Sequence, residues 1–411
     1  MALTKEELGQ RIRSARESCG LTQEQLGDVV ELSRIAISQI EAGSRSVSSI
    51  ELDRIAYTVG RDIKAFFAEN FVEQDALAAL FRSEAQLAEQ AELLDALQNS
   101  LALGREMTNL ERLLEIDRAQ LRTATYELAT AKSRWEAIQQ GQRVAADERQ
   151  RLGLGVAPVG DLVDLFETQG VRTGLVTLPD NISGLTLSDN KIGIFVVINR
   201  DHAALRRRFS LAHEYAHVLV DRDRSGAISR AENRADLIEV RANAFAAEFM
   251  MPADGVAQFV QALGKGGASR AQMAVFDETA VVQVEQRATP GSQDIQLYDV
   301  ALLAHHFSVS RISALYRLKN LRFVDEREFQ HLKAQEDSGA GKSIANFLAA
   351  NDPVEEQETR DEFRRRFLGL ALEANRREEI TESKFTELAA MVGMSRKEVR
   401  QVLASAGLEQ A

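Results

Sequence analysis

The sequence has almost none of the residues that build disulfide or thiolate sites. Its 411 residues include a single cysteine, Cys19. One cysteine excludes intramolecular disulfides, zinc ribbons and iron–sulfur clusters within one chain, and it is typical of a reducing cytoplasm. No stretch reaches the roughly 18 consecutive apolar residues of a membrane helix, and the start MALTKEELGQ has no basic-then-apolar signal pattern. We therefore expect a cytoplasmic protein without a membrane segment.

The chain also lacks an excess of positive charge. Lys and Arg total 50 and Asp and Glu total 62, which gives a formal charge of −12. This balance argues against a protein that coats nucleic acid through bulk positive charge, so any DNA contact must be local. Proline is scarce, with 5 residues, which favours helices. A chain of 411 residues is too long to fold around one hydrophobic core. We expect two or three domains that are mainly α with a small β region.

The spacing of apolar residues predicts four segments. A bundle of short helices occupies residues 1–70. Residues 71–150 form a long helical segment, hinged at Gly104, that links domains and mediates dimerisation. Residues 151–290 hold the one clear β region, Val171 to Asn199, followed by helices over Arg206 to Val220 and Ala231 to Met251, with a surface loop at Asp221 to Arg230 between them. Residues 291–411 form C-terminal helices.

Two short helices joined by a tight turn are predicted near the start. Thr22 can cap a helix whose Gln25 completes a capping box, and Ser33 caps the next helix, which ends at Ala42-Gly43. In a DNA-binding pair of this kind, the second helix lies in the major groove. The alternative from spacing alone is a helical bundle with no DNA partner.

The predicted second helix places a distinct set of side chains on its outer face. Arg34, Ile35, Ser38 and Gln39 would be exposed, while Ile37 and Ile40 face the core. Arg and Gln side chains make bidentate contacts to base edges, and flanking polar residues hold phosphates. The candidate DNA-binding residues are Gln23, Ser33, Arg34, Ile35, Ser38, Gln39 and Arg45.

The string Gly20-Leu-Thr-Gln-Glu-Gln-Leu, followed by Leu32-Ser-Arg-Ile-Ala-Ile-Ser-Gln-Ile-Glu-Ala-Gly43, resembles the XRE helix-turn-helix family across residues 4–67. The resemblance implies a sequence-specific, repressor-like module that binds palindromic double-stranded DNA as a dimer.

The sharpest chemical signal is His213-Glu214-Tyr215-Ala216-His217. Residues four apart share one face of a helix, so both imidazoles can reach one metal ion, and Glu214 lies about 100° round the helix, where it can hold a water molecule. A zinc ion with three protein ligands and an open position lowers the pKa of its water to about 7, and a neighbouring carboxylate can take the proton. Chance is the alternative explanation of the pattern.

A third ligand is expected on the next helix. Glu232, Asp236, Glu239 and Glu248 all qualify by their chemistry, and spacing alone does not choose among them. A solvated charged face is the alternative role of these carboxylates.

A longer pattern surrounds the paired histidines. Arg208-Phe-Ser-Leu-Ala-His-Glu-Tyr-Ala-His-Val-Leu219, with Glu239-Val-Arg-Ala-Asn-Ala-Phe-Ala-Ala-Glu-Phe-Met-Met-Pro252, resembles the ImmA/IrrE family of metallopeptidases, over roughly residues 151–335. The resemblance implies an α+β zincin-like domain in which His213, His217 and Glu239 bind zinc, or another divalent metal such as Mn²⁺, and Glu214 is the catalytic base. Position 216 departs from the family, which commonly has Gly there.

The strand Ile194 to Asn199 precedes the predicted metal-binding helix. In similar zinc peptidases an edge strand at this place pairs with the extended substrate through its main chain. An ordinary buried strand is the equally weighted alternative.

Two further helix-turn-helix patterns follow, at residues 302–318 and 383–404. They resemble C-terminal parts that accompany ImmA/IrrE domains, and we expect packing or protein recognition from them. His305 and His306 are adjacent and point about 100° apart, so they form a poor chelating pair, and we expect them to be partly buried helix residues.

Together the two resemblances indicate a transcriptional regulator that is also a metallo-endopeptidase. Its expected partners are operator DNA and a protein substrate, either its own chain or an XRE-type repressor, in a response to DNA damage or phage-related stress. The rival hypothesis is a ligand- or protein-sensing transcription factor whose metal domain does not cut. The intact Glu214 favours catalysis, because a structural metal site needs no base.

Overall fold

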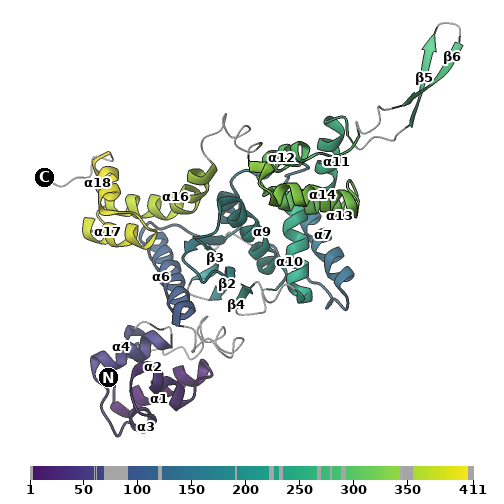
Figure 1. The fold of residues 1–411 in the computed structure, drawn as a ribbon. Coiled ribbons are helices and arrows are strands. Elements are labelled where there is room, and N and C mark those ends of the chain that lie inside the picture. The colour runs from purple at the N-terminus through teal and green to yellow at the C-terminus, as the bar shows by residue number, and fades with distance from the viewer. Residues whose placement is uncertain are drawn as a thin grey trace.

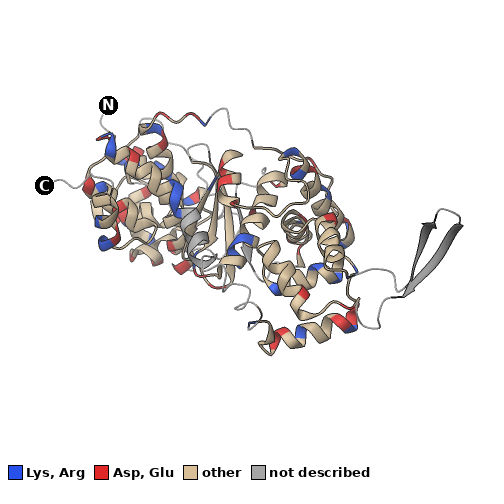
Figure 2. Ribbon diagram, turned by 90° about the horizontal axis from the view of Figure 1, so that it is seen from above, with Lys and Arg blue, Asp and Glu red and all other residues tan. Residues whose placement is uncertain are grey.

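The computed structural model describes residues 3–59, 61, 63–68, 91–118, 123–189, 192–221, 226–230, 235–265, 270–277, 280–287, 293–342, 344 and 355–405. This part of the chain is mainly helical, with one four-stranded sheet and a separate two-stranded hairpin (Figure 1). The expected fold class, mainly α with a small β region, is confirmed (Figure 2). Among the described helices, none has the length and apolar character that crossing a membrane requires.

The N-terminal unit consists of α1 (Lys5–Ser18), α2 (Gln23–Val30), α3 (Arg34–Glu41), α4 (Ser49–Thr58) and the 3-10 helix η1 (Ile63–Phe67). The capping box at Thr22 forms as predicted, and Ser33 accepts a hydrogen bond from the backbone N–H of Ala36. Gly9 lies where α1 meets α3, and a Cβ there would come within 2.4 Å of the Ile40 carbonyl oxygen. The close contact between these helices therefore requires glycine.

The sheet contains β1 (Val171–Val176), β2 (Ile182–Asp189), β3 (Gly193–Asn199) and β4 (Gly226–Arg230) in the order β1-β3-β2-β4. The β1–β3 pair is parallel, and β2 is antiparallel to both β3 and β4. Strand β3 is therefore central. The prediction of an edge strand at Ile194 to Asn199 is wrong, because both sides of this strand are already paired, and the alternative of an ordinary buried strand is confirmed.

Strand β4 also corrects the predicted surface loop at Asp221 to Arg230. Its sequence, Gly-Ala-Ile-Ser-Arg, is short and has one β-branched residue, so it carries little β signal of its own. Pairing with β2 imposes the extended conformation on it. This correction changes which strand lies at the sheet edge near the candidate site.

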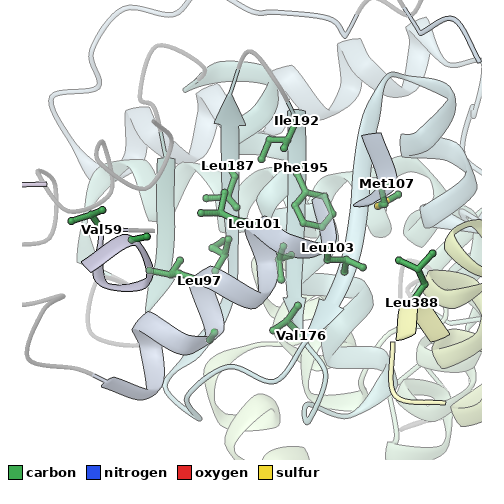
Figure 3. Packing of buried hydrophobic residues seen from close by; sticks show 14 of the residues in the cluster. Val59, Leu97, Leu101, Leu103, Met107, Val176, Leu187, Ile192, Phe195 and Leu388 are labelled. Carbon is green, nitrogen blue, oxygen red and sulfur yellow. The ribbon is translucent and has the colours of Figure 1, made fainter. Parts of the chain in front are cut away.

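Helices cover both faces of the sheet because successive side chains of a strand point to opposite sides. Helix α6 (Ala91–Leu113) packs on the face that includes Phe195 and Val197, whereas α9 (Ala204–Val220) packs on the face of Val196 and Ile198. Figure 3 shows Leu97, Leu101 and Leu103 of α6 near Leu187 and Phe195 of the sheet. Helix α6 is thus a layer of the core.

The predicted hinge at Gly104 is wrong, because α6 runs unbroken through this residue. A Cβ at Gly104 would lie 3.2 Å from the Phe195 ring, so the glycine lets the helix approach the sheet. Residues 123–132 are not helical, and the next helix, α7 (Arg134–Arg151), packs along α10 (Leu237–Met250). The dimerisation role of residues 71–150 stays a prediction.

Further helices complete the described chain. They are α8 (Leu162–Thr168), α11 (Ala253–Ala262), α12 (Leu297–His306), α13 (Arg311–Asn320), α14 (Glu326–Asp337), α16 (Glu355–Arg376), α17 (Glu382–Met391) and α18 (Arg396–Ser405). The helix–turn–helix geometry predicted for residues 302–318 and 383–404 is confirmed.

A hairpin of β5 (Arg270–Asp277) and β6 (Ala280–Arg287) lies between α11 and α12 and projects from the helices (Figure 1). This hairpin was not predicted, although the run Ala280-Val-Val-Gln-Val284 has a β-branched signal. His305 and His306 are exposed rather than partly buried, and the ring of His306 stacks on Phe259 at 4.7 Å between centroids.

Candidate metal centre

Three predicted ligands meet in the interior of the peptidase-like region. His213 and His217 lie one turn apart on α9, and Glu239 lies in the first turn of α10. The His213 Nε2 atom is 3.1 Å from Glu239 Oε2 and 3.2 Å from His217 Nε2, and His217 Nε2 is 3.4 Å from Glu239 Oε1. All three side chains are buried or nearly so. Helix packing between α9 and α10 therefore assembles two imidazoles and one carboxylate around one point.

The donor set fits a divalent metal ion. The Nδ1 atoms face acceptor oxygens, Asn243 Oδ1 at 3.1 Å from His213 and Asp221 Oδ2 at 3.0 Å from His217. These partners place the proton of a neutral imidazole on Nδ1, so both Nε2 atoms present lone pairs to the same point as the carboxylate of Glu239. Tetrahedral zinc with bonds of about 2.0–2.1 Å would hold its ligand atoms about 3.3–3.4 Å apart, close to the observed separations.

The electrostatics of the three groups favour a positive charge between them. Burial alone would lower the pKa of His217, but the hydrogen bonds that its ring donates to the carboxylates of Asp221 and Glu239, with the nearby charge of Glu214, raise this pKa to about 10. Burial also opposes the charge on Glu239, yet both imidazoles lower its pKa to about 2. The carboxylates around the imidazoles thus stabilise a cation at this place, either a proton or a metal ion.

Glu214 is fully buried and lies beside the ligands on α9. Its Oε2 accepts a hydrogen bond of 2.8 Å from Thr186 Oγ1 on β2, while its Oε1 has no hydrogen-bond partner among the described residues. A Cβ at Gly184 would come within 3.0 Å of that Oε1, so the glycine of β2 leaves space at this oxygen. One oxygen is therefore fixed, and the other has hydrogen-bonding capacity that no described residue uses.

The other candidates for the third ligand do not join this cluster. Glu248 is at the opposite end of α10, where it pairs with Arg317 and accepts a hydrogen bond of 2.9 Å from the backbone N–H of Ala253. Asp236 is the N-cap residue of α10, and Glu232 lies outside the described residues. Of the described candidates, the geometry selects Glu239.

Some residues that contact the candidate site had not been predicted from the sequence. Asp221 also pairs with Arg241, whose Nη2 is 2.5 Å from Asp221 Oδ1. Asp221 follows His217 by four residues, which is the spacing of neighbours on one helix face, so the sequence could have identified Asp221 as a partner of His217. Asn243 was visible in the Glu-x-x-Ala-Asn pattern, but without an assigned contact. Thr186 had no local signal, because only the sheet register brings it to Glu214.

The departure at position 216 is accommodated by packing. Ala216 is buried in the core on α9, and its methyl group belongs to the hydrophobic cluster there. The neighbouring Tyr215 stacks on Phe166 at 3.9 Å between centroids and donates a hydrogen bond of 2.5 Å to Glu148 on α7. The rear face of α9 is thus held by aromatic and polar contacts.

The ligand-orienting role of Asp221 gives a testable prediction. An Asp221→Asn variant should bind zinc about 10–100-fold more weakly, because the amide is uncharged and holds the His217 Nδ1–H less strongly. Competition with a chelating dye measures the affinity. An Asp254→Asn variant, changed at the start of α11 away from the ligands, is the control and should bind as the wild type does. Equal zinc affinity in all three proteins would disprove the role of Asp221.

In the N-terminal unit, four of the residues predicted to read DNA share the exposed face of α3. Arg34, Ile35, Ser38 and Gln39 are exposed on α3, and Ile35 is 69% exposed, although it is a large apolar side chain. Ile37 and Ile40 face the core as predicted.

The two residues expected to hold phosphates have partners within the chain. Gln23 Nε2 donates a hydrogen bond of 2.8 Å to Glu41, which also binds Arg16, and Arg45 pairs with Glu51 at 2.6 Å. Phosphate contacts by Gln23 and Arg45 therefore stay predictions.

Comparison with known families agrees with this division. Residues 7–63 match a helix-turn-helix domain, and residues 173–319 match an IrrE N-terminal-like domain, which is a metallopeptidase family. Both matches fall inside the ranges of the two resemblances. A search of curated proteins found no match. The chain thus joins an XRE-like helix-turn-helix domain to an IrrE/ImmA-like peptidase domain.

Proposed function

We propose that this protein is a cytoplasmic, homodimeric transcriptional regulator whose second domain is a zinc metallo-endopeptidase. Its substrate is its own chain or an XRE-type repressor, cleaved in response to DNA damage or phage-related stress. The observation that carries the peptidase assignment is the buried Glu214 carboxylate beside the His213, His217 and Glu239 cluster, with one oxygen fixed by Thr186 and the other without a partner among the described residues. A structural metal site needs no such base.

The residues divide the chemistry of peptide hydrolysis among them. A divalent ion held by His213, His217 and Glu239 would supply Lewis acidity to the scissile carbonyl and to water. Glu214 Oε1 accepts the proton of the attacking water and passes it to the leaving amine. The Thr186 hydroxyl fixes the other carboxylate oxygen, so that the base keeps one orientation. Burial of the cluster strengthens these electrostatic interactions.

A substrate strand would add to β4 rather than to β3. Strand β4 is at the edge of the described sheet, and its Ala227 lies opposite Thr186, while Ser229 lies opposite Gly184. Thr186 donates a hydrogen bond to the Glu214 carboxylate, and a Cβ at Gly184 would lie 3.0 Å from Glu214 Oε1. Main-chain pairing of an extended peptide with β4 would therefore bring it beside the catalytic groups.

The DNA-binding proposal depends on the exposed face of α3. An Arg34→Ala/Gln39→Ala variant should bind a duplex selected from a random pool about 30- to 25,000-fold more weakly, because two bidentate base contacts are lost and each costs about 1–3 kcal/mol. Fluorescence anisotropy measures the loss. An Arg13→Ala variant removes an exposed arginine from α1 as the control. Equal binding by both variants would contradict the assignment of α3.

The non-proteolytic sensor is the competing function, and one experiment separates the two. Metal-loaded protein is incubated with the selected operator, single-stranded DNA and candidate XRE-type repressors, beside a Glu214→Gln variant, and fragments are sought by mass spectrometry. Fragments from the wild type alone support the peptidase. If neither protein yields fragments under any condition while both still bind metal and DNA, the sensor is the better assignment.

A further inference from the structure

The described chain contains three helix–turn–helix pairs, α2–α3, α12–α13 and α17–α18. The second helix of each pair starts after a serine, which accepts a hydrogen bond from a backbone N–H of the first turn: Ser33 from Ala36, Ser310 from Ser313, and Ser395 from Glu398. The pairs therefore share local geometry. They differ in the side chains that the second helix exposes.

Helix α13 uses its arginines inside the chain. Arg317 is 2% exposed, donates a hydrogen bond of 2.9 Å to the Met251 carbonyl oxygen and pairs with Glu248. Arg311 pairs with Glu336 at 2.6 Å. This helix thus fastens the C-terminal end of α10 to α14 and offers no unpaired arginine to a partner.

Helix α18 has the opposite character. Arg396, Lys397, Arg400 and Gln401 are exposed, while Val399 and Leu403 are buried against the preceding helices. Within the part of the chain that the structure describes, none of the three cations forms an ion pair. Their helix therefore combines an apolar inner face with a cationic outer face.

The exposed positions of α18 repeat those of α3. Each helix exposes its first, second, fifth and sixth residues, which are Arg34, Ile35, Ser38 and Gln39 in α3 and Arg396, Lys397, Arg400 and Gln401 in α18. Both helices end this set with a glutamine. The α18 face carries two more cations than the α3 face.

Charge accumulates around the turn between α17 and α18. Arg364 donates a hydrogen bond of 3.2 Å to the Gly393 carbonyl oxygen, and Arg200 donates one of 3.3 Å to the carbonyl oxygen of Met391. The one acidic residue in the first turn of α18, Glu398, binds the backbone N–H and hydroxyl of Ser395. In a chain of net charge −12, this is a local cationic surface.

One long helix contacts elements near the first and the last of these helix pairs. Near the start of α6, Asp95 and Gln98 bind Tyr57 on α4. In the second half of α6, Glu106 pairs with Lys384 of α17 at 2.9 Å. Figure 1 shows α6 between the N-terminal helices and α17. Helix α6 therefore contacts both the N-terminal unit and α17.

From these observations we infer that α17–α18 is a second contact surface for double-stranded DNA. Arg396, Lys397 and Arg400 contact backbone phosphates, and Gln401 faces a groove. Duplex DNA fits better than an acidic protein because the geometry is that of α2–α3, and because three unpaired cations on one short helix match a regular phosphate backbone. This surface requires neither the peptidase activity nor the α3 contacts.

The test uses the full chain with Arg34→Ala/Gln39→Ala as background, so that α3 does not dominate binding. Anisotropy with a random-sequence duplex is measured over a series of salt concentrations. Adding Arg396→Ala/Lys397→Ala/Arg400→Ala should lower the slope of log affinity against log salt by about 2.7, or about 0.9 for each of three phosphates. The matched control, Arg327→Ala/Lys333→Ala/Lys342→Ala, removes three cations from and near α14 and should leave the slope unchanged. Thermal melting checks that each variant folds.

The same variants distinguish DNA from an acidic protein partner. Polyglutamate is the probe for the second possibility. Loss of duplex binding in the α18 triple variant alone supports the inference. An unchanged salt slope in that variant, an equal change in the control, or loss of polyglutamate binding with duplex binding retained would overturn it.

Discussion

A Glu214→Gln variant should cleave its substrate about 10²–10⁴-fold more slowly than the wild type, because the amide cannot accept the proton of the attacking water. The substitution keeps the size of the side chain, and its Oε atom can still accept the hydrogen bond from Thr186. Metal affinity should change little, since Glu214 is not among the three converging ligand atoms. The cleavage rate is measured on whichever substrate, a repressor or the chain itself, yields fragments in the incubation experiment described above. Metal content is determined on the same samples.

A variant of the supporting hydroxyl provides the control for this prediction. Thr186→Val removes the hydrogen bond to Glu214 Oε2 and keeps the side-chain volume, so it should lower the rate by a smaller factor than Glu214→Gln does. If Glu214→Gln cleaves at the wild-type rate with full metal content, Glu214 is not the base. If Thr186→Val is the slower of the two, the hydroxyl has a larger role than holding the carboxylate.

The second large effect concerns the ligands. His217→Ala should reduce bound zinc from one ion per chain to nearly none, with a loss of affinity greater than the roughly 10–100-fold caused by changing a ligand-orienting partner. Removing one imidazole leaves two of the three converging side chains and breaks the contact to Asp221. Metal content of dialysed protein, measured by atomic emission, gives the result.

A histidine elsewhere in the chain is the matched control. His331 is exposed on α14, and His331→Ala should retain one zinc ion per chain. A Glu239→Ala variant should behave like His217→Ala. If all three variants, His217→Ala, Glu239→Ala and His331→Ala, keep one zinc ion per chain, the metal is bound at a different place.

Local sequence patterns were sufficient to predict the helices that hold the candidate metal-binding and DNA-binding residues. The four-residue spacing of His213 and His217 required a helix, and α9 places both imidazoles together. The caps at Thr22 and Ser33 fixed the starts of α2 and α3, and the 3.6-residue period identified their outer faces. These predictions succeeded because each depends on residues close in sequence.

Features that depend on distant residues could not be predicted in the same way. Nothing in the sequence of β3 indicates that it has strands on both sides, and β4 has too few β-branched residues to stand out. The sequence left four carboxylates as candidates for the third ligand, and of those described only Glu239 lies in the cluster with both imidazoles. Thr186 reaches Glu214 only through a contact between residues 28 positions apart in the sequence.

Anomalous diffraction at the zinc edge from crystals of the zinc-loaded chain tests the proposed catalytic centre most directly. We expect one ion per chain, bound by His213 Nε2, His217 Nε2 and Glu239, with one position open to solvent and the unpaired oxygen of Glu214 facing it. An open position next to a base is what a hydrolytic site needs. A fourth protein ligand closing the coordination sphere, or zinc bound away from these three residues, would contradict a peptidase at this site.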